Sequence, residues 1–137
     1  MKALFHLSLP CIGIERTKNF YVNILGATIG RNTQQWIDID MFGHQITFTK
    51  SGDYQFNYKS YKFGNNVLPS FHFGVILEKQ IWKDLYTKLV DAKIIFIDTT
   101  VFLEEKNGMH SSFFVKDPNG YIVEFKCFEA IETMFLK

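Results

Sequence analysis

An internal repeat is the feature of this sequence that most restricts its fold. The pair Phe-His at residues 5–6 recurs 66 positions later at residues 71–72, and in both places it opens a short apolar stretch. The pattern Asp-x-x-Gly-x-x-x-x-Phe occupies residues 40–48 and returns 77 positions later at residues 117–125. Self-similarity of this kind indicates that one structural unit occurs twice in the chain.

The two copies carry the same order of secondary-structure signals. Each begins with a short apolar run typical of a strand, near residues 4–10 and 71–78. Apolar residues spaced i, i+3 and i+4 then predict amphipathic helices over residues 15–25 and 79–91. Three runs rich in β-branched and aromatic residues follow each helix and predict further strands. These lie near residues 27–32, 35–42, 44–50, 94–102, 110–117 and 121–128.

We therefore predict an α+β protein with a single domain over residues 1–137, built from two βαβββ modules. The modules span about residues 1–50 and 70–129, and residues 51–69 form a linker rich in Tyr and Phe. A chain of 137 residues, of which 47% are hydrophobic, is long and apolar enough to form one core.

Charge and hydropathy exclude several classes of partner. The net charge of +1 leaves no large basic face for a phosphate backbone, so we expect no nucleic-acid partner. The sequence has neither a long apolar run nor a start typical of a secretory signal, so we expect a cytoplasmic protein with no membrane partner. Cys11 and Cys127 are too few for a disulfide framework and are interpreted as buried free thiols, with a single bridge between them left open.

Three polar side chains are predicted to share one face of the sheet. Side chains alternate between the two faces of a strand, so His6 lies opposite its apolar neighbour Leu7, and Glu124 lies opposite Phe125. The repeat places His72 on the face that corresponds to that of His6. Two imidazoles and one carboxylate are a set that holds a divalent ion such as Fe²⁺ and leaves positions open for water, substrate or O₂.

We accordingly predict His6, His72 and Glu124 as ligands of a divalent metal ion. Each has a structural interpretation when taken alone, because a histidine on a strand is often only hydrogen-bonded and Glu124 can form a salt bridge with a lysine. The agreement of repeat position and strand parity across the three residues favours the metal site. Thr47 is the counterpart of Glu124 in the first module and is a poor ligand, so we expect three protein ligands and about three exchangeable positions.

The other two histidines receive different interpretations. His110 opens a strand of the second module and is the candidate catalytic acid or base, because a neutral imidazole beside a metal-bound substrate can move protons near neutral pH. The alternative for His110 is a solvated side chain just after a turn. His44 is predicted to face away from the site and to be structural.

The motifs of both modules resemble the vicinal oxygen chelate superfamily, the group of glyoxalases, bleomycin resistance proteins and extradiol dioxygenases. The resemblance rests on His6 and on residues 20–26, 42–45, 72–75 and 117–125. It implies that the two modules form a cupped, partly open barrel of mixed sheet. It also implies that His6, His72 and Glu124 bind metal. Glyoxalases usually have a fourth ligand where Thr47 stands here, so the pattern favours the three-ligand members, extradiol dioxygenases and fosfomycin-modifying thiol transferases.

Several functions follow as hypotheses. The first is a metal-dependent enzyme resembling extradiol dioxygenases, in which a divalent ion, with Fe²⁺ favoured, chelates a small substrate through vicinal oxygens. The second is a glyoxalase-type lyase or a fosfomycin-type thiol transferase with Zn²⁺, Mn²⁺ or Ni²⁺. The third is a non-enzymatic drug-binding protein of the bleomycin-resistance type, and a purely structural metal site is the last.

We also expect a homodimer, because this fold leaves sheet edges that need covering. The sequence leaves open whether the metal site forms within one chain or across the dimer.

Overall fold

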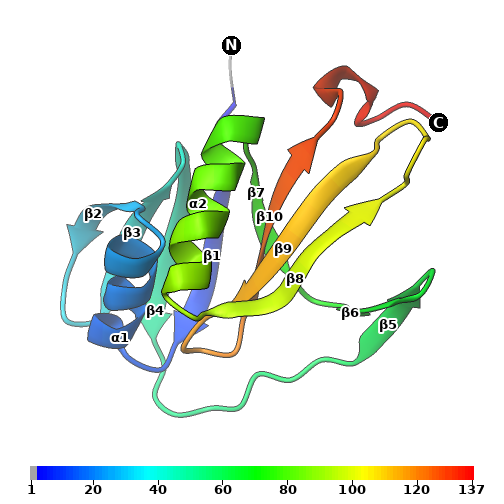
Figure 1. The fold of residues 1–137 in the computed structure, drawn as a ribbon. Helices are drawn as coiled ribbons and strands as arrows, with labels where there is room; N and C mark the ends of the chain where they lie inside the picture. The colour runs from blue at the N-terminus through cyan, green and yellow to red at the C-terminus, as the bar shows by residue number, and fades with distance from the viewer. Residues whose placement is uncertain (1–2) are drawn as a thin grey trace. The chain divides into compact units, whose positions relative to one another are not determined.

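The computed structural model of the protein describes residues 3–137; Met1 and Lys2, which begin the predicted first module, lie outside the described residues. The chain divides into two compact units (Figure 1). The first contains the described residues up to Asn57 together with Asp117–Gly120, and the second contains Tyr58–Lys116 and Tyr121–Lys137. Each unit has an open, four-stranded mixed sheet with helix beside it, which confirms the predicted α+β class.

The first unit is built on one sheet with the strand order β1-β4-β3-β2. Strand β1 runs parallel to β4, and the other neighbours are antiparallel. The four predicted strands of this module agree with the observed ones to within two residues at each end. The elements are β1 (His6–Cys11), α1 (Ile14–Lys18), a π-helix η1 (Asn19–Ile24), β2 (Thr28–Asn32), β3 (Trp36–Met41) and β4 (His44–Lys50).

The predicted helix of the first unit is split into two parts. The apolar spacing predicts one helix over residues 15–25, whereas the structure has the short α1 followed directly by η1. The N–H of Leu25 donates to the carbonyl of Phe20, five residues back, at 2.9 Å, as in a π-helix. Phe20 and Tyr21 are buried all the same, so the apolar face that the spacing predicts packs against the core.

The second unit is built on a sheet with the strand order β7-β10-β9-β8. Helix α2 coincides with the predicted helix and covers one face of this sheet. The indole N–H of its Trp82 donates to the backbone carbonyl of Phe125 at 2.8 Å, and the Trp82 ring lies 5.3 Å from that of Phe113. The elements are β5 (Ser60–Phe63), β6 (Asn66–Pro69), β7 (Phe73–Ile76), α2 (Lys79–Asp91), β8 (Ile95–Phe102), β9 (His110–Lys116), β10 (Ile122–Phe128) and a short 3-10 helix η2 (Ile131–Thr133).

The segment predicted as a linker, residues 51–69, contains a β-hairpin. Strands β5 and β6 pair with each other and, in the described part of the chain, with no other strand. All four residues of β5 are exposed, so the alternation that identifies a strand in a sequence is absent there. The hairpin is anchored by Leu68, which belongs to a buried cluster with Phe102, Phe114 and Ile122.

The strand registers agree with the alignment of the two copies. In the first unit Thr47 of β4 lies opposite Ser8 of the parallel strand β1. In the second unit Glu124 of β10 lies opposite Gly74 of the parallel strand β7. Thr47 and Glu124 therefore occupy equivalent places in their sheets.

A buried polar network holds the turn between β9 and β10, which groups with the first unit. The Tyr21 hydroxyl donates to Asp117 Oδ2 at 2.8 Å, and the backbone N–H of Asn119 donates to Asp117 Oδ1 at 2.8 Å. The Asn119 side-chain oxygen in turn accepts the backbone N–H of Ile12 at 2.8 Å. Gly120 has φ = 91°, the left-handed conformation that this Asp-Pro-Asn-Gly turn requires of its last residue.

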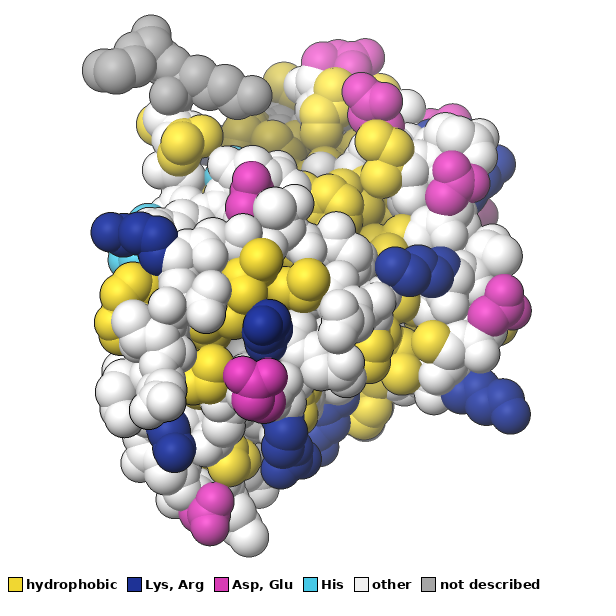
Figure 2. All heavy atoms as spheres, turned by 90° about the vertical axis from the view of Figure 1, so that its left-hand side faces the viewer, with side chains coloured by type: hydrophobic (Ala, Val, Ile, Leu, Met, Phe, Trp, Pro, Cys, Tyr) yellow, Lys and Arg dark blue, Asp and Glu magenta, His cyan; other side chains and the backbone are white. Residues whose placement is uncertain are grey.

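The surface carries charges of both signs. On the face drawn in Figure 2, Lys and Arg side chains stand singly or in small groups among acidic and apolar ones, in agreement with the net charge of +1. Within residues 3–137, the helices are all too short or too polar to span a bilayer. Cys11 and Cys127 are buried free thiols, as predicted, and burial raises the pKa of both.

Candidate functional site

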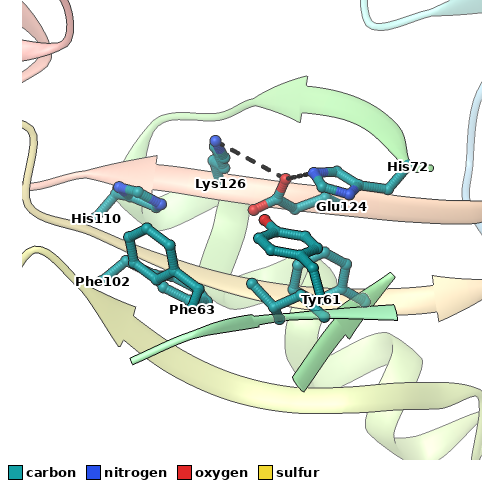
Figure 3. A pocket seen from close by; sticks show the side chains of 9 residues that line it. Tyr61, Phe63, His72, Phe102, His110, Glu124 and Lys126 are labelled. Carbon is teal, nitrogen blue, oxygen red and sulfur yellow. Dashed lines mark ion pairs between the residues drawn. The ribbon is translucent and has the colours of Figure 1, made fainter. Parts of the chain in front are cut away.

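A pocket of about 130 Å³ lies in the second unit, on the sheet beside the β5–β6 hairpin (Figure 3). One part of its wall is apolar and largely aromatic, and the other part is polar. The apolar residues are Tyr61, Phe63, Leu68, Phe102 and Phe114. The polar residues are His72, His110, Glu124 and Lys126.

Strand β10 supplies two of the polar side chains. Glu124 and Lys126 are two residues apart and both line the pocket, as strand alternation requires. Phe125, between them, packs at 5.3 Å from the ring of Phe113, which in turn contacts Trp82 of α2. The predicted parity of β10 is therefore correct: its apolar side chains pack beneath the helix, and Glu124 takes the opposite face.

His72 and Glu124 form a close pair. The Nε2 atom of His72 lies 3.1 Å from Oε2 of Glu124, and Nδ1 of His72 lies 3.0 Å from the backbone carbonyl of Pro69. A carbonyl oxygen only accepts hydrogen bonds, so Nδ1 carries a proton and Nε2 faces the carboxylate. Ser112, on the neighbouring strand β9, donates its hydroxyl to the other carboxylate oxygen, Oε1, at 2.8 Å.

These contacts shift both pKa values toward the charged pair. The hydrogen bond to Glu124 raises the pKa of His72 and outweighs the opposing effect of burial. Burial raises the pKa of Glu124, but the hydrogen bonds from His72 and Ser112 and the charge of Lys126 outweigh it, so this pKa lies below its ordinary value.

Lys126 is the second cation beside the carboxylate. Its Nζ lies 3.8 Å from Oε2 of Glu124, and its side chain is 32% exposed. The salt bridge with a lysine, which is the structural alternative for Glu124, therefore exists alongside the histidine pair. Lys126 was not singled out from the sequence, although its position two residues after Glu124 on one strand is a signal that places it on the same face.

His110 lies in the same pocket as His72 and Glu124. Its Nδ1 is 2.8 Å from the carbonyl of Gly108, and its ring packs against those of Phe102 and Phe128, with centroids 5.2 and 5.0 Å away. The side chain is half-buried rather than fully solvated. Since Nδ1 donates to a carbonyl, Nε2 of the neutral ring is left as an acceptor.

His6 belongs to the first unit. It is the first residue of β1, lies opposite Gln45 of β4, and has an exposed side chain. The second unit brings His72 and Glu124 together, and within residues 3–137 no three His, Cys, Asp or Glu side chains form a group able to hold a metal ion. The role of His6 as a third ligand stays a prediction. His44 makes a structural contact, because its Nδ1 accepts the backbone N–H of Phe5 at 3.3 Å.

Thr47, the counterpart of Glu124, takes part in a different network in the first unit. Its hydroxyl donates to Oδ1 of the buried Asp38 at 2.6 Å, and Arg31 forms an ion pair with Oδ2 of Asp38 at 3.2 Å. The equivalent positions of the two sheets thus have different chemistry.

The sequence pattern that defines the Glyoxalase/Bleomycin resistance protein/Dioxygenase superfamily matches residues 3–125. The chain belongs to this superfamily. Its members include enzymes and typically use divalent metal ions. A comparison with curated proteins finds no match.

Solved structures of the superfamily resemble this chain over nearly its whole length. The glyoxalase/bleomycin resistance protein/dioxygenase from Alicyclobacillus acidocaldarius is 26% identical, with 97% of this chain and 96% of that chain covered and a TM-score of 0.82. The genomically encoded fosfomycin resistance protein from Listeria monocytogenes is 13% identical, with 98% and 99% covered and a TM-score of 0.71. The second likeness shows the fold alone. Together they confirm the predicted glyoxalase/dioxygenase-like fold.

Proposed function

We propose that this protein is a metal-dependent enzyme that binds a small substrate through neighbouring oxygen atoms on a divalent ion, in the manner of the extradiol dioxygenases it resembles. The observation that carries the proposal is the His72–Glu124 pair in the aromatic pocket of the second unit. An ion held there would act as a Lewis acid and lower the pKa of a substrate hydroxyl.

The donor set of the pair fits a divalent ion. Two ligand atoms that each lie about 2.1 Å from an ion, at right angles to each other, are about 3.0 Å apart. Nε2 of His72 and Oε2 of Glu124 are 3.1 Å apart. An imidazole nitrogen and a carboxylate oxygen suit Fe²⁺, Zn²⁺, Mn²⁺ and Ni²⁺, and a set of two histidines and one carboxylate favours Fe²⁺.

The surroundings of the pair also support metal binding. A histidine ligand generally donates its other ring N–H to a carbonyl or carboxylate, which fixes the ring and its tautomer. His72 makes this contact with Pro69, and Ser112 holds the carboxylate of Glu124 through the oxygen that does not face His72. We propose His6, on the equivalent position of the first module, as the third protein ligand.

His110 is the residue proposed to move a proton. The contact of Nδ1 with Gly108 fixes the ring, and Nε2 is the atom that can accept a proton from a substrate hydroxyl and return it. The His110 ring lines the same pocket as His72 and Glu124, so one small molecule can contact all three side chains (Figure 3).

Metal binding is the direct test. Chelator-treated wild type is titrated with Fe²⁺ without air and with Zn²⁺, Mn²⁺ and Ni²⁺, and bound metal is measured by elemental analysis. We expect equimolar binding in the wild type and in the control variant His44→Ala, and loss of binding in His72→Ala and Glu124→Gln, with folding checked by circular dichroism. His6→Ala tests the third ligand.

A wild type that binds none of these ions, or variants at His72 and Glu124 that bind them unchanged, would overturn the proposal. If iron is bound, oxygen uptake with catechols tests the dioxygenase reaction, and His110→Gln should slow it while metal stays bound. If zinc or nickel is preferred, isomerisation of a hemithioacetal is the reaction to measure.

A further inference from the structure

With a divalent ion in place, the positive charge in the pocket would exceed what the carboxylate of Glu124 can balance. Oε1 of Glu124 accepts the Ser112 hydroxyl at 2.8 Å, and Oε2 faces His72 at 3.1 Å. Lys126 faces the same Oε2 at 3.8 Å, which is beyond hydrogen-bond distance. A divalent ion held by His72 and Glu124 would carry two positive charges against one carboxylate, which leaves the charge of Lys126 without a counter-ion.

We propose that Lys126 is the substrate-positioning residue of this pocket and that it binds an anionic group, so that the substrate is a small organic acid. The inference rests on the proposed metal-dependent function, to which it adds the chemical class of the substrate. An ammonium group pairs well with a carboxylate or phosphonate oxygen, and such charge-assisted hydrogen bonds are stronger than neutral ones.

Lys126 lies where it can bind an anionic group of a ligand. Its side chain lines the pocket and is 32% exposed, so its charge is partly desolvated but reachable. Within residues 3–137, Glu124 is its only ion-pair partner, and its ammonium group forms no hydrogen bond. Its N–H groups are therefore available to a ligand. Figure 3 shows Lys126 on the same side of the pocket as His110 and Glu124, with Tyr61, Phe63 and Phe102 on the other side.

The rest of the wall determines the size and polarity of the body of the ligand. Tyr61, Phe63 and Phe102 present aromatic surface to the cavity. A cavity of about 150 Å³ lined by apolar side chains is large enough for benzene. The pocket here has about 130 Å³, so it takes an apolar body of about the size of one ring, with the acidic group toward Lys126.

The test compares two probes that differ in charge and hardly in shape, benzoate and benzamide. Dissociation constants are measured by calorimetry or by NMR titration for wild type, Lys126→Met and the control Lys116→Met. Lys116 is on the neighbouring strand β9, outside the pocket. Each protein is measured free of metal and after loading with Zn²⁺, and bound zinc is determined in the same samples.

Free of metal, we expect wild type and Lys116→Met to prefer benzoate over benzamide by about tenfold, the size of one charge-assisted contact, and Lys126→Met to lose this preference. After loading, Lys126→Met should hold as much zinc as the wild type. With zinc, whose charge also attracts benzoate, the preference should be larger in each protein and about tenfold smaller in Lys126→Met than in wild type. A wild type that binds zinc but shows no preference for benzoate overturns the role of Lys126 and leaves the proposed function standing.

The remaining outcomes separate the two proposals further. If the wild type binds no zinc but prefers benzoate, and Lys126→Met does not, the lysine site is supported and the metal-dependent function is refuted. If metal-free Lys126→Met keeps the benzoate preference, or if Lys126→Met loses its zinc together with the preference, the lysine only balances the charge of Glu124 and the inference is wrong.

Discussion

The hydrogen bond from Ser112 to Glu124 gives a quantitative test of the pocket. Ser112 is fully buried, and its hydroxyl donates to Oε1 of the carboxylate at 2.8 Å. The substitution Ser112→Ala removes this donor and deletes only one oxygen atom, so the cavity that it leaves contributes little. Hydrogen bonds to charged groups stabilise a protein by about 1.5–3 kcal/mol, and we expect this loss in the free energy of unfolding.

The expected change is large enough to measure by thermal or chemical unfolding. An unfolding entropy of about 2.1 cal/mol/K per residue gives about 0.29 kcal/mol/K for this chain of 137 residues. The substitution should therefore lower the Tm by about 5–10 °C. Ser111→Ala is the matched control, because Ser111 is the preceding residue of β9, half-buried, and outside the pocket. We expect it to change stability by less than about 0.5 kcal/mol.

The pH dependence of this stability change shows whether it comes from the lost hydrogen bond to the Glu124 carboxylate or from lost packing. The pKa of Glu124 lies below its ordinary value, so the interactions of its charged form stabilise the protein above the unfolded pKa of about 4.3 and are lost as the pH falls through the folded pKa. The difference between wild type and Ser112→Ala should be full near pH 7 and shrink in acid. Equal effects of the two alanine substitutions, or a difference that is constant down to pH 3, would refute this reasoning. The measurement is made with a chelator, so it does not depend on metal binding.

Two further predictions concern the framework around the site. Tyr21→Phe should lower the free energy of unfolding by about 1.5–3 kcal/mol in urea titrations, because the Tyr21 hydroxyl donates to the buried carboxylate of Asp117. The control is Tyr86→Phe, which removes a hydrogen bond to Asp98 at an exposed position and should have little effect. Gly74→Ala should destabilise the protein by about 1–3 kcal/mol or more, because the added Cβ would collide with the backbone of Glu124. Elemental analysis of this variant after metal titration should find no bound ion.

The sequence is sufficient to predict the elements that have long, regular patterns. Helix α2 lies where the apolar spacing predicts it, and β9 and β10 follow the turn chemistry at residues 117–120. The face taken by Glu124 is also predictable, because β10 keeps one register with β9 over all seven of its residues. The placement of His72 beside Glu124 follows from the same argument, since β7 is the parallel neighbour of β10.

Other parts depend on contacts that a sequence pattern does not encode. Lys126 is one of thirteen lysines; its place two residues after Glu124 predicts the face of β10 that it takes, but not that its Nζ lies 3.8 Å from the carboxylate. Tyr61 and Phe63 of the aromatic wall come from β5, whose four exposed residues carry no alternating pattern. The π-helix η1 preserves the apolar face of the predicted helix, so the pattern alone cannot reveal the wider turn. His6 lies in a different unit from His72 and Glu124, and its role as a ligand is tested by His6→Ala.

The β5–β6 hairpin has a consequence for how the ligand preference of such proteins changes in evolution. Tyr61 and Phe63 shape the cavity from β5, which among the described residues pairs only with β6, whereas Glu124 lies on a strand held by neighbours on both sides. Mutations in the hairpin can therefore accumulate without breaking the ladder that fixes the carboxylate. Under the proposed function, the preference for one ligand over another can change over evolutionary time while the metal-binding pair is inherited. Two descendants of one ancestor can thus keep the same histidine and glutamate and still act on unrelated molecules.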